Sequence, residues 1–166
     1  MEFTVLEGDI AEESADALVN AAGTSLRMGS GVAGALRRKG GEALNDAAVA
    51  KGPIDLGEVA VTDSFDLDAT YVLHAAAMPH FGDGKATASS IEAATRNALS
   101  VADELACHSL VMPILGTGEA GMDFESGAKI VIREIDRFEP RHLSEVSVIA
   151  FERSQFELLC RITDSL

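Results

Sequence analysis

Residues 109–121, Ser-Leu-Val-Met-Pro-Ile-Leu-Gly-Thr-Gly-Glu-Ala-Gly, decide the fold of this chain. The residues before the first glycine are almost all apolar, which is typical of a strand in a sheet covered on both faces. The rest has the pattern G-x-G-x-x-G, in which glycines allow positive φ and let backbone N–H groups converge on an anion. We therefore expect a buried strand that leads into an anion-binding loop.

The same glycine pattern occurs a second time, at residues 29–34 (Gly-Ser-Gly-Val-Ala-Gly). This copy also follows an apolar run, residues 17–19, and precedes a segment with helical spacing. The following helix adds free N–H groups and the positive end of its dipole. One such loop is weak evidence, but two in 166 residues indicate two cradles for one ligand, most simply for the two phosphates of a diphosphate.

Length and composition predict one folded domain over residues 1–166. The hydrophobic fraction is 47% and the charged fraction 24%, and no apolar run approaches the roughly 20 residues of a membrane-spanning helix. The N-terminus lacks a signal-peptide pattern, so we expect a cytoplasmic protein without membrane association. We also expect the protein to be a monomer. Cys107 and Cys160 lie far apart and are expected to be reduced core thiols. No clustered His or Cys spacing suggests a metal, and we expect no metal and no cofactor.

The net charge of −14 is unusual, and lysine occurs at only four positions. Such an acidic surface repels polyanions, so non-specific binding to nucleic acid is not expected. Two interpretations stay open: halophile-like adaptation to high salt, and an acidic protein of an ordinary cytosol. Because few basic side chains are present, backbone N–H groups would have to bind an anionic ligand.

Strand and helix patterns alternate along the chain. This order predicts an α/β protein with a three-layer α/β/α fold and a mixed, mostly parallel sheet of six or seven strands. We expect both glycine loops at the carboxyl ends of strands, on one side of the molecule. Strands are predicted at 3–7, 16–22, 58–62, 71–75, 109–115 and 145–151, and helices at 32–38, 42–51, 89–107, 124–138 and 154–162.

Two common nucleotide-binding folds fit poorly. A dinucleotide-binding fold joins its first strand tightly to the glycine loop, whereas here residues 20–28 intervene. Neither glycine loop ends in Gly-Lys-Ser/Thr, which argues against a P-loop ATPase.

Motifs along nearly the whole chain instead resemble those of the macro domain family, which binds ADP-ribose. The residues of these motifs match the family pattern, and so do their order and spacing along the chain. They are Gly-Asp-Ile at 8–10, Asp-Ala-Leu-Val-Asn-Ala-Ala at 16–22, Gly-Ser-Gly-Val-Ala at 29–33, Tyr-Val-Leu-His at 71–74 and Pro-Ile-Leu-Gly-Thr-Gly at 113–118.

The resemblance implies a role for each part of the site. Asp9 would accept a hydrogen bond from the adenine amino group, and Phe151 would stack on the base. The alternatives are an ordinary turn aspartate and a core aromatic. The glycine loops would wrap the diphosphate with backbone amides. The implied ligand-binding residues are Asp9, Ile10, Asn20, Gly29, Ser30, Gly31, Val32, Gly116, Thr117, Gly118, Glu119, Ala120, Gly121 and Phe151.

Three departures from the family pattern fall around the distal ribose. Gly23 stands where many hydrolytic members have a second Asn, Ala33 where many have an Asp, and Ala120 where Phe or Tyr is usual. Gly23 is expected to use a positive φ. ADP-ribose binding should survive these changes, whereas the commonest hydrolytic mechanism lacks its usual residues.

Other residues could supply the chemistry. Glu119 in the second loop, and His80 and Asp83 in the segment 78–84, are the candidates for activating water, with ordinary loop residues as the alternative. His74, in a buried strand, is expected to be a satisfied core histidine. Two function classes remain. One is a hydrolase acting on an ADP-ribosyl ester of protein or nucleic acid, on O-acetyl-ADP-ribose or on ADP-ribose 1″-phosphate. The other is a non-catalytic ADP-ribose-binding module.

Overall fold

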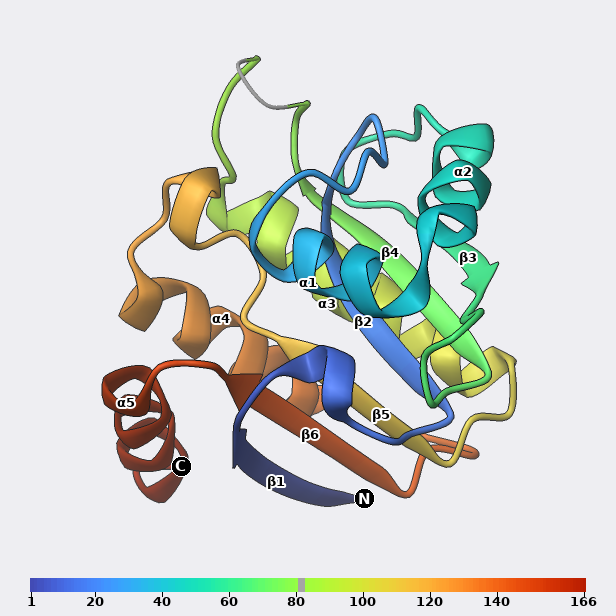
Figure 1. The fold of residues 1–166 in the computed structure, drawn as a ribbon. Helices are drawn as coiled ribbons and strands as arrows, with labels where there is room; N and C mark the ends of the chain where they lie inside the picture. The colour runs from blue at the N-terminus through green and yellow to red at the C-terminus, as the bar shows by residue number, and fades with distance from the viewer. Residues whose placement is uncertain (81–82) are drawn as a thin grey trace.

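A computed structural model of the chain describes residues 1–80 and 83–166. Strands and helices alternate in it, as the sequence predicts (Figure 1). The strands are β1 (Glu2–Glu7), β2 (Ala17–Gly23), β3 (Val59–Asp63), β4 (Tyr71–Met78), β5 (Ser109–Pro113) and β6 (Glu145–Ala150). The helices are α1 (Gly31–Gly40), α2 (Glu42–Lys51), α3 (Ala88–Glu104), α4 (Phe124–Arg137) and α5 (Arg153–Asp164), with short 3₁₀ turns η1 (Ile10–Glu12) and η2 (Gly118–Ala120).

The six strands form one mixed sheet in the order β1-β6-β5-β2-β4-β3. All neighbours are parallel except β3 and β4, so five strands point the same way. Their carboxyl ends therefore lie in a row, which we call the carboxyl edge. At about 4.8 Å between neighbouring strands, that row spans about 19 Å. The loops along it follow β1, β6, β5, β2 and β4, in that order.

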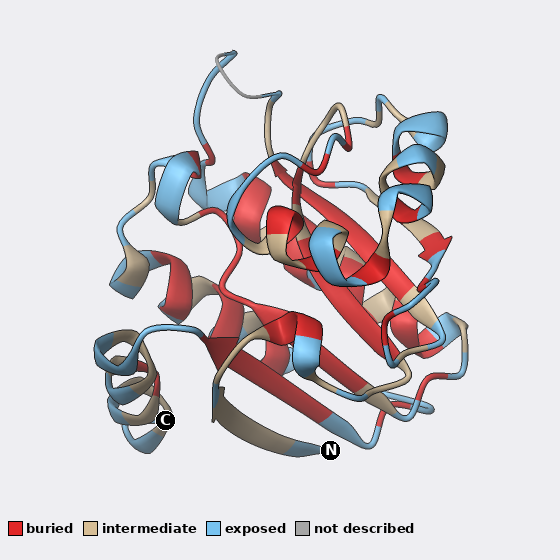
Figure 2. Cartoon of the chain, in the orientation of Figure 1, coloured by how far each residue is buried: buried red, intermediate tan, exposed pale blue. Residues whose placement is uncertain are grey.

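Helices cover both faces of the sheet, which confirms the three-layer prediction (Figure 1). One core cluster joins the sheet to α1, α2 and η1, and the other joins it to α3, α4 and α5. Neighbouring residues of β2 divide between the two clusters: Leu18 packs on the α1 side and Val19 on the α3 side. Because both faces are covered, the central strands are almost wholly buried (Figure 2).

Four predicted elements end earlier than expected, of which α4 stops one residue short, at Arg137. The helix predicted to reach residue 107 stops at Glu104, because Ala106 has φ 59° and reverses the chain. The strand predicted to reach residue 115 stops at Pro113, the last residue paired with β6. The last strand ends at Ala150, opposite Glu7, so Phe151 lies just beyond the sheet.

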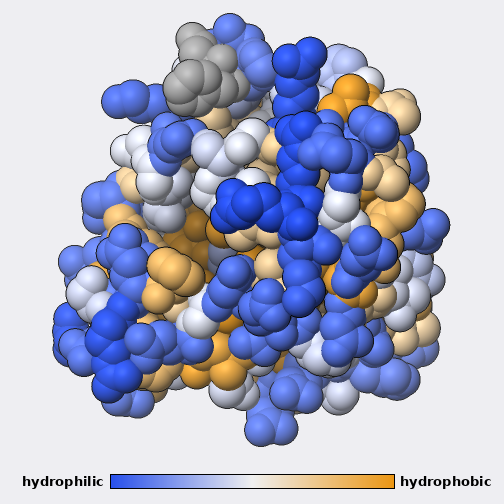
Figure 3. All heavy atoms as spheres, in the orientation of Figure 1, coloured by the Kyte–Doolittle hydropathy of each residue, from blue (hydrophilic) through white to orange (hydrophobic). Residues whose placement is uncertain are grey.

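The surface is mostly polar. Figure 3 shows hydrophilic side chains over most of one face, with smaller apolar areas among them. Phe151 is the most exposed of the large apolar side chains in the described part of the chain, with 77% of its surface accessible. Among helices of residues 1–80 and 83–166, none is both long enough and apolar enough to cross a bilayer.

Candidate ligand-binding site

The two glycine loops meet at the carboxyl edge, as predicted. The first follows β2 and the second follows β5, and these strands are neighbours. A hydrogen bond joins them directly: the Ser30 hydroxyl donates to Oε2 of Glu119 over 2.8 Å. Residues 89 positions apart in the chain thus form one continuous surface.

The middle glycine of each motif faces open space. Gly31 has φ +60° and Gly118 has φ +69°, and no described atom lies within 4 Å of a Cβ built on either. By contrast, a Cβ at Gly116 would lie 2.3 Å from Ile91, and one at Gly121 would lie 2.7 Å from Lys85. The middle glycines therefore leave backbone open to a ligand, whereas Gly116 and Gly121 allow the loop to pack closely.

The first motif is half loop and half helix. Helix α1 already begins at Gly31, with Ser30 as the residue before its first turn. The Ser30 hydroxyl is turned to Glu119 instead of back to α1. The N–H groups of the first turn are consequently left for an anion, and the helix dipole favours one there.

A cavity of about 450 Å³ lies beside this helix end. Asp9, Ile10 and Phe151 line one side of it, and Gly31 and Val32 line the other. These five residues come from the ends of β1 and β6 and from the start of α1. The structure thus places Asp9 and Phe151 at one cavity, where the resemblance implied an adenine site.

The Asp9 carboxylate is partly engaged. Its Oδ1 accepts the N–H of Ala11 over 2.9 Å and so caps η1. This bond fixes the carboxylate beside the buried Ile10. One oxygen holds the turn, and a carboxylate has further acceptor positions for a ligand donor.

Arg38 is a site residue that the sequence reasoning missed. It lines the same cavity as Asp9 and Phe151. Its Nη1 lies 3.3 Å from where a Cβ on Gly34 would be, so the side chain folds back along α1 toward the helix start. Gly31, Ala35 and Arg38 are spaced so that they lie on one face of a helix. That spacing is the sequence feature that could have indicated Arg38 as a neighbour of the first glycine loop.

The neighbouring Arg37 is already paired. It donates to both carboxylate oxygens of Glu42 over 2.7 and 2.8 Å, and to the carbonyl of Met28 over 2.9 Å. The hydrogen bonds with Glu42 raise the pKa of Arg37 and lower that of Glu42. Among the described residues, Arg38 has no such ion pair. Its charge remains available at the cavity.

Asn20 lies in the core, with only 1% of its surface accessible. Its Nδ2 donates to Nδ1 of His74 over 3.0 Å, and Nε2 of His74 lies 2.9 Å from the hydroxyl of Thr62. Burial, helped by the charge of Lys51, lowers the pKa of His74 to about 4 and keeps it neutral. These three polar side chains cross β2, β4 and β3, and we call them the buried polar row. His74 is the core histidine predicted, whereas the burial of Asn20 gives the expected ligand contact no support.

The three catalytic candidates come from two loops. Glu119 is exposed at the centre of the edge, bonded to Ser30. His80 and Asp83 lie in the loop after β4, where the Asp83 N–H donates to the carbonyl of His80 over 2.9 Å. Phe81 and Gly82 of the same segment lie outside the described residues. Nδ1 of His80 is 2.9 Å from the hydroxyl of Ser25, a contact that was not predicted.

The prediction of a positive φ at Gly23 is wrong. Its φ lies outside that region, and the reason for glycine is space. A Cβ there would be 3.1 Å from the carbonyl oxygen of Pro79 and 3.6 Å from Cα of His80. The backbone of the loop after β4 therefore occupies the place of a side chain at position 23.

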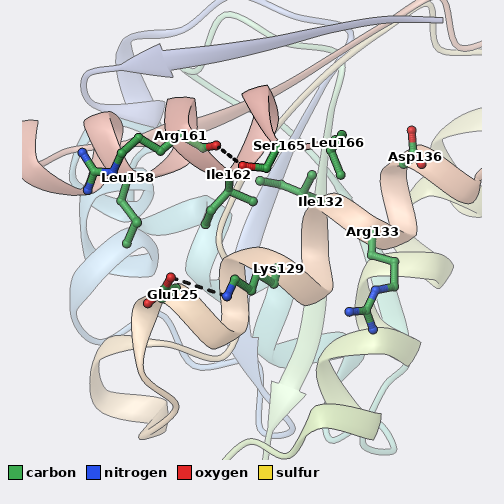
Figure 4. Close-up of a pocket in the computed structure, with 10 residues that line it drawn as sticks. All are labelled: Glu125, Lys129, Ile132, Arg133, Asp136, Leu158, Arg161, Ile162, Ser165 and Leu166. Atoms are coloured by element: carbon green, nitrogen blue, oxygen red, sulfur yellow. Dashed lines mark hydrogen bonds and ion pairs between the residues drawn. The ribbon is translucent and has the colours of Figure 1, made fainter.

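A second hollow lies away from the carboxyl edge, between α4 and α5 (Figure 4). Its volume is about 430 Å³. Ile132, Leu158 and Ile162 give it apolar walls, and Lys129 at its rim pairs with Glu125 over 3.5 Å. It contains none of the predicted ligand-binding residues. Over the described part of the chain, no group of three or more His, Cys, Asp or Glu could hold a metal ion.

The fold is that of an α/β protein whose two glycine loops lie side by side at the carboxyl edge of its sheet. The sequence pattern of the Macro domain family matches residues 19–131. The chain belongs to the macro domain family.

Relatives and solved structures agree with this assignment. An uncharacterised protein of Saccharolobus solfataricus is 37% identical over 100% of this chain and 94% of its own length. An uncharacterised Mycobacterium tuberculosis protein is 39% identical over 88% of this chain, but over only 40% of its own length. A variant of the Oceanobacillus iheyensis macrodomain, solved with ADP-ribose, superposes with a TM-score of 0.87 at 25% identity, covering 97% of this chain and 91% of that one.

Proposed function

We propose that this protein binds ADP-ribose along the carboxyl edge of its sheet. The adenine would lie at the cavity between Asp9 and Phe151, and the diphosphate over Gly31 and Gly118. The distal ribose would then point toward the loops that follow β2 and β4. The observation that supports the proposal is the strand order, because Asp9, Phe151, the two glycine loops and His80 all follow neighbouring strands in a single row.

The dimensions and the charges support this placement. A row of about 19 Å suits an extended ligand with two riboses better than a mononucleotide. Backbone N–H groups at the start of α1 would bind the phosphates without attracting other polyanions to an acidic surface. Arg38 adds one cationic side chain at the cavity. The related O. iheyensis macrodomain variant was solved with ADP-ribose. That ligand contains the adenine, the diphosphate and the two riboses that this placement requires.

We further propose that the protein is a hydrolase of an ADP-ribose derivative. The substrates considered are an ADP-ribosyl ester on protein or nucleic acid, O-acetyl-ADP-ribose and ADP-ribose 1″-phosphate. His80 and Asp83 supply ionisable groups on the side of the edge where the distal ribose would lie, and Glu119 supplies one at the centre of the edge. We treat residues 1–166 as a single macro domain, because β1 near one end of the chain pairs with β6 near the other.

A non-catalytic ADP-ribose-binding module is the second candidate. Gly23, Ala33 and Ala120 favour it, because none carries a polar side chain at the three positions where the family pattern usually has a functional one. Ala33 and Ala120 are also buried, so they offer no group to a substrate.

The direct test is to incubate the protein with an ADP-ribosylated protein, with O-acetyl-ADP-ribose and with ADP-ribose 1″-phosphate. Release of free ADP-ribose from any of them supports the hydrolase. Calorimetric binding of ADP-ribose without release supports the binding module. If ADP-ribose does not bind at all, both functions are excluded.

A further inference from the structure

A serine and a histidine form a close pair at the distal end of the carboxyl edge. Nδ1 of His80 lies 2.9 Å from Oγ of Ser25. The N–H of Arg27 points to the same Oγ at 3.4 Å, so that oxygen already has a donor. The proton of the Ser25 hydroxyl is therefore free to point toward Nδ1. A hydroxyl that donates to an imidazole nitrogen is the arrangement of an activated nucleophile.

Both members of the pair are held by their neighbours. The N–H of His80 donates to the hydroxyl of Thr24 over 3.1 Å, which ties the loop after β4 to the loop after β2. A turn closes around Ser25, in which the N–H of Leu26 donates to the carbonyl of Gly23 over 3.1 Å. Leu26 has φ 62° and a fully buried side chain. A left-handed conformation is strained for leucine, and burial of the side chain keeps it in place.

The loop that carries His80 also lies against the position of the family's missing side chain. Cα of His80 lies 3.6 Å from where a Cβ on Gly23 would be. The carbonyl oxygen of Pro79 lies closer, 3.1 Å from that Cβ, so the loop that carries His80 packs this closely on β2 because residue 23 has no side chain. The absence of the usual Asn and the presence of the Ser25–His80 pair are thus two consequences of one local arrangement.

We propose that Ser25 and His80 act as nucleophile and base in cleaving acyl esters on the distal ribose of ADP-ribose. Nδ1 of His80 takes the hydroxyl proton while Oγ of Ser25 bonds to the acyl carbonyl carbon. The bond from that carbon to the ribose oxygen breaks, the ribose oxygen receives the proton from His80, and the acyl group stays on Ser25. Water then attacks the acyl-serine with His80 as base, releases the carboxylic acid and restores the hydroxyl.

This mechanism makes the substrate class narrower than in the proposed function on which it rests. Acyl transfer requires a carbonyl carbon, so O-acetyl-ADP-ribose is a substrate and ADP-ribose 1″-phosphate is not. The glycosidic bond of the distal ribose is not broken. A covalent acyl-serine distinguishes this route from direct attack of water on the ester.

The test uses the full chain and O-acetyl-ADP-ribose. Mixing followed by acid quench and peptide mass spectrometry should find an acetyl group on Ser25, together with a rapid first release of ADP-ribose. Ser25→Ala and His80→Ala should each lower turnover by at least about 100-fold and keep wild-type affinity for ADP-ribose. Ser89→Ala and His142→Ala are matched controls, since both residues are exposed outside the proposed site and should leave turnover unchanged.

The outcomes separate this inference from the proposed function. Wild-type turnover by Ser25→Ala, or hydrolysis without an acetyl-serine, overturns the pair as nucleophile and base. Release of ADP-ribose by Ser25→Ala from a protein that carries it through an acyl ester would do so too, while leaving the hydrolase proposal intact. Binding of ADP-ribose with no cleavage of the acetyl ester overturns the inference and supports the binding module. Absence of ADP-ribose binding overturns both.

Discussion

The two ends of the carboxyl edge differ in how they are built. At the adenine end, Asp9 and Phe151 lie at the positions that the family motifs indicate, and they share one cavity. At the distal end, Gly23 departs from the family, and the loop after β4 brings His80 against Ser25. In the proposed function, binding and chemistry depend on loops that follow different strands, so each should be changeable without the other.

The largest expected effect concerns the glycine loop between the two ends. Gly118→Val puts a branched side chain into the open space where the diphosphate would lie, at φ +69°. Overpacking of this kind costs about 1–3 kcal/mol, so ADP-ribose affinity should fall by up to about 100-fold. Isothermal titration calorimetry measures the change.

Gly41→Val is the matched control for that variant. Gly41 also has a positive φ, +99°, but lies at the opposite end of α1. It should carry a similar backbone strain and keep normal affinity. Equal loss of binding in the two variants would show that strain, and not contact with the ligand, is responsible.

The second prediction tests the adenine end alone. Asp9→Asn keeps an oxygen that can cap Ala11 and removes the carboxylate charge. A lost hydrogen bond to a charged group costs about 1–3 kcal/mol, so ADP-ribose and AMP should both bind more weakly. Asp63→Asn removes the same charge at an exposed position at the end of β3 and should have no effect. Unchanged affinity of Asp9→Asn for AMP would contradict the placement of the adenine at this cavity.

The third prediction concerns the buried polar row beneath the distal end. His74 has a pKa of about 4 in the folded protein, against 6.5 as its ordinary value. Between these values the unfolded chain binds more protons, so the free energy of unfolding falls as the pH falls from 6.5 toward 4. At pH 5.5 the expected loss from His74 is about 1 kcal/mol.

Urea unfolding at pH 7.5 and 5.5 measures that loss. Other groups titrate in both proteins, so the quantity to compare is the change in wild type minus the change in His74→Gln. Wild type should lose more stability than the variant. An equal loss in the two proteins would contradict a neutral, buried His74.

The smallest expected effect separates two adjacent arginines. Arg38→Ala should weaken ADP-ribose binding by up to about 1 kcal/mol, because the guanidinium is exposed and its contact is screened. The loss should shrink as salt is added. Arg37→Ala removes the same charge but breaks the pair with Glu42, so it should act on stability and not on binding. A larger loss of binding in Arg37→Ala than in Arg38→Ala would show that Arg37, and not Arg38, contacts the ligand.

Much of the adenine end could be predicted from the sequence, because it depends on local patterns. Alternating strands and helices predict the parallel carboxyl edge, and each glycine motif lies in the connection that follows a strand. Arg38 was missed because its role depends on a flexible side chain folding back along α1. The bond between Asn20 and His74 could not be predicted, because these residues become neighbours only when β2 and β4 are paired.

The distal end could not be predicted, because it is a contact between loops. Ser25 and His80 are 55 residues apart, and no periodic pattern relates them. The need for glycine at position 23 comes from the carbonyl of Pro79, which belongs to the other loop. Local sequence rules can suggest the backbone conformation of a glycine. They do not show which neighbouring group occupies the space where a side chain would lie.

Calorimetry on the wild-type protein with ADP-ribose, ADP and AMP tests the central claim most directly. A ligand that lies along the whole edge should gain affinity with each added part, so ADP-ribose should bind more tightly than ADP, and ADP more tightly than AMP. The largest gain is expected when the second phosphate reaches the glycine loops. Equal affinities for AMP and ADP-ribose would contradict an extended site from Asp9 to His80.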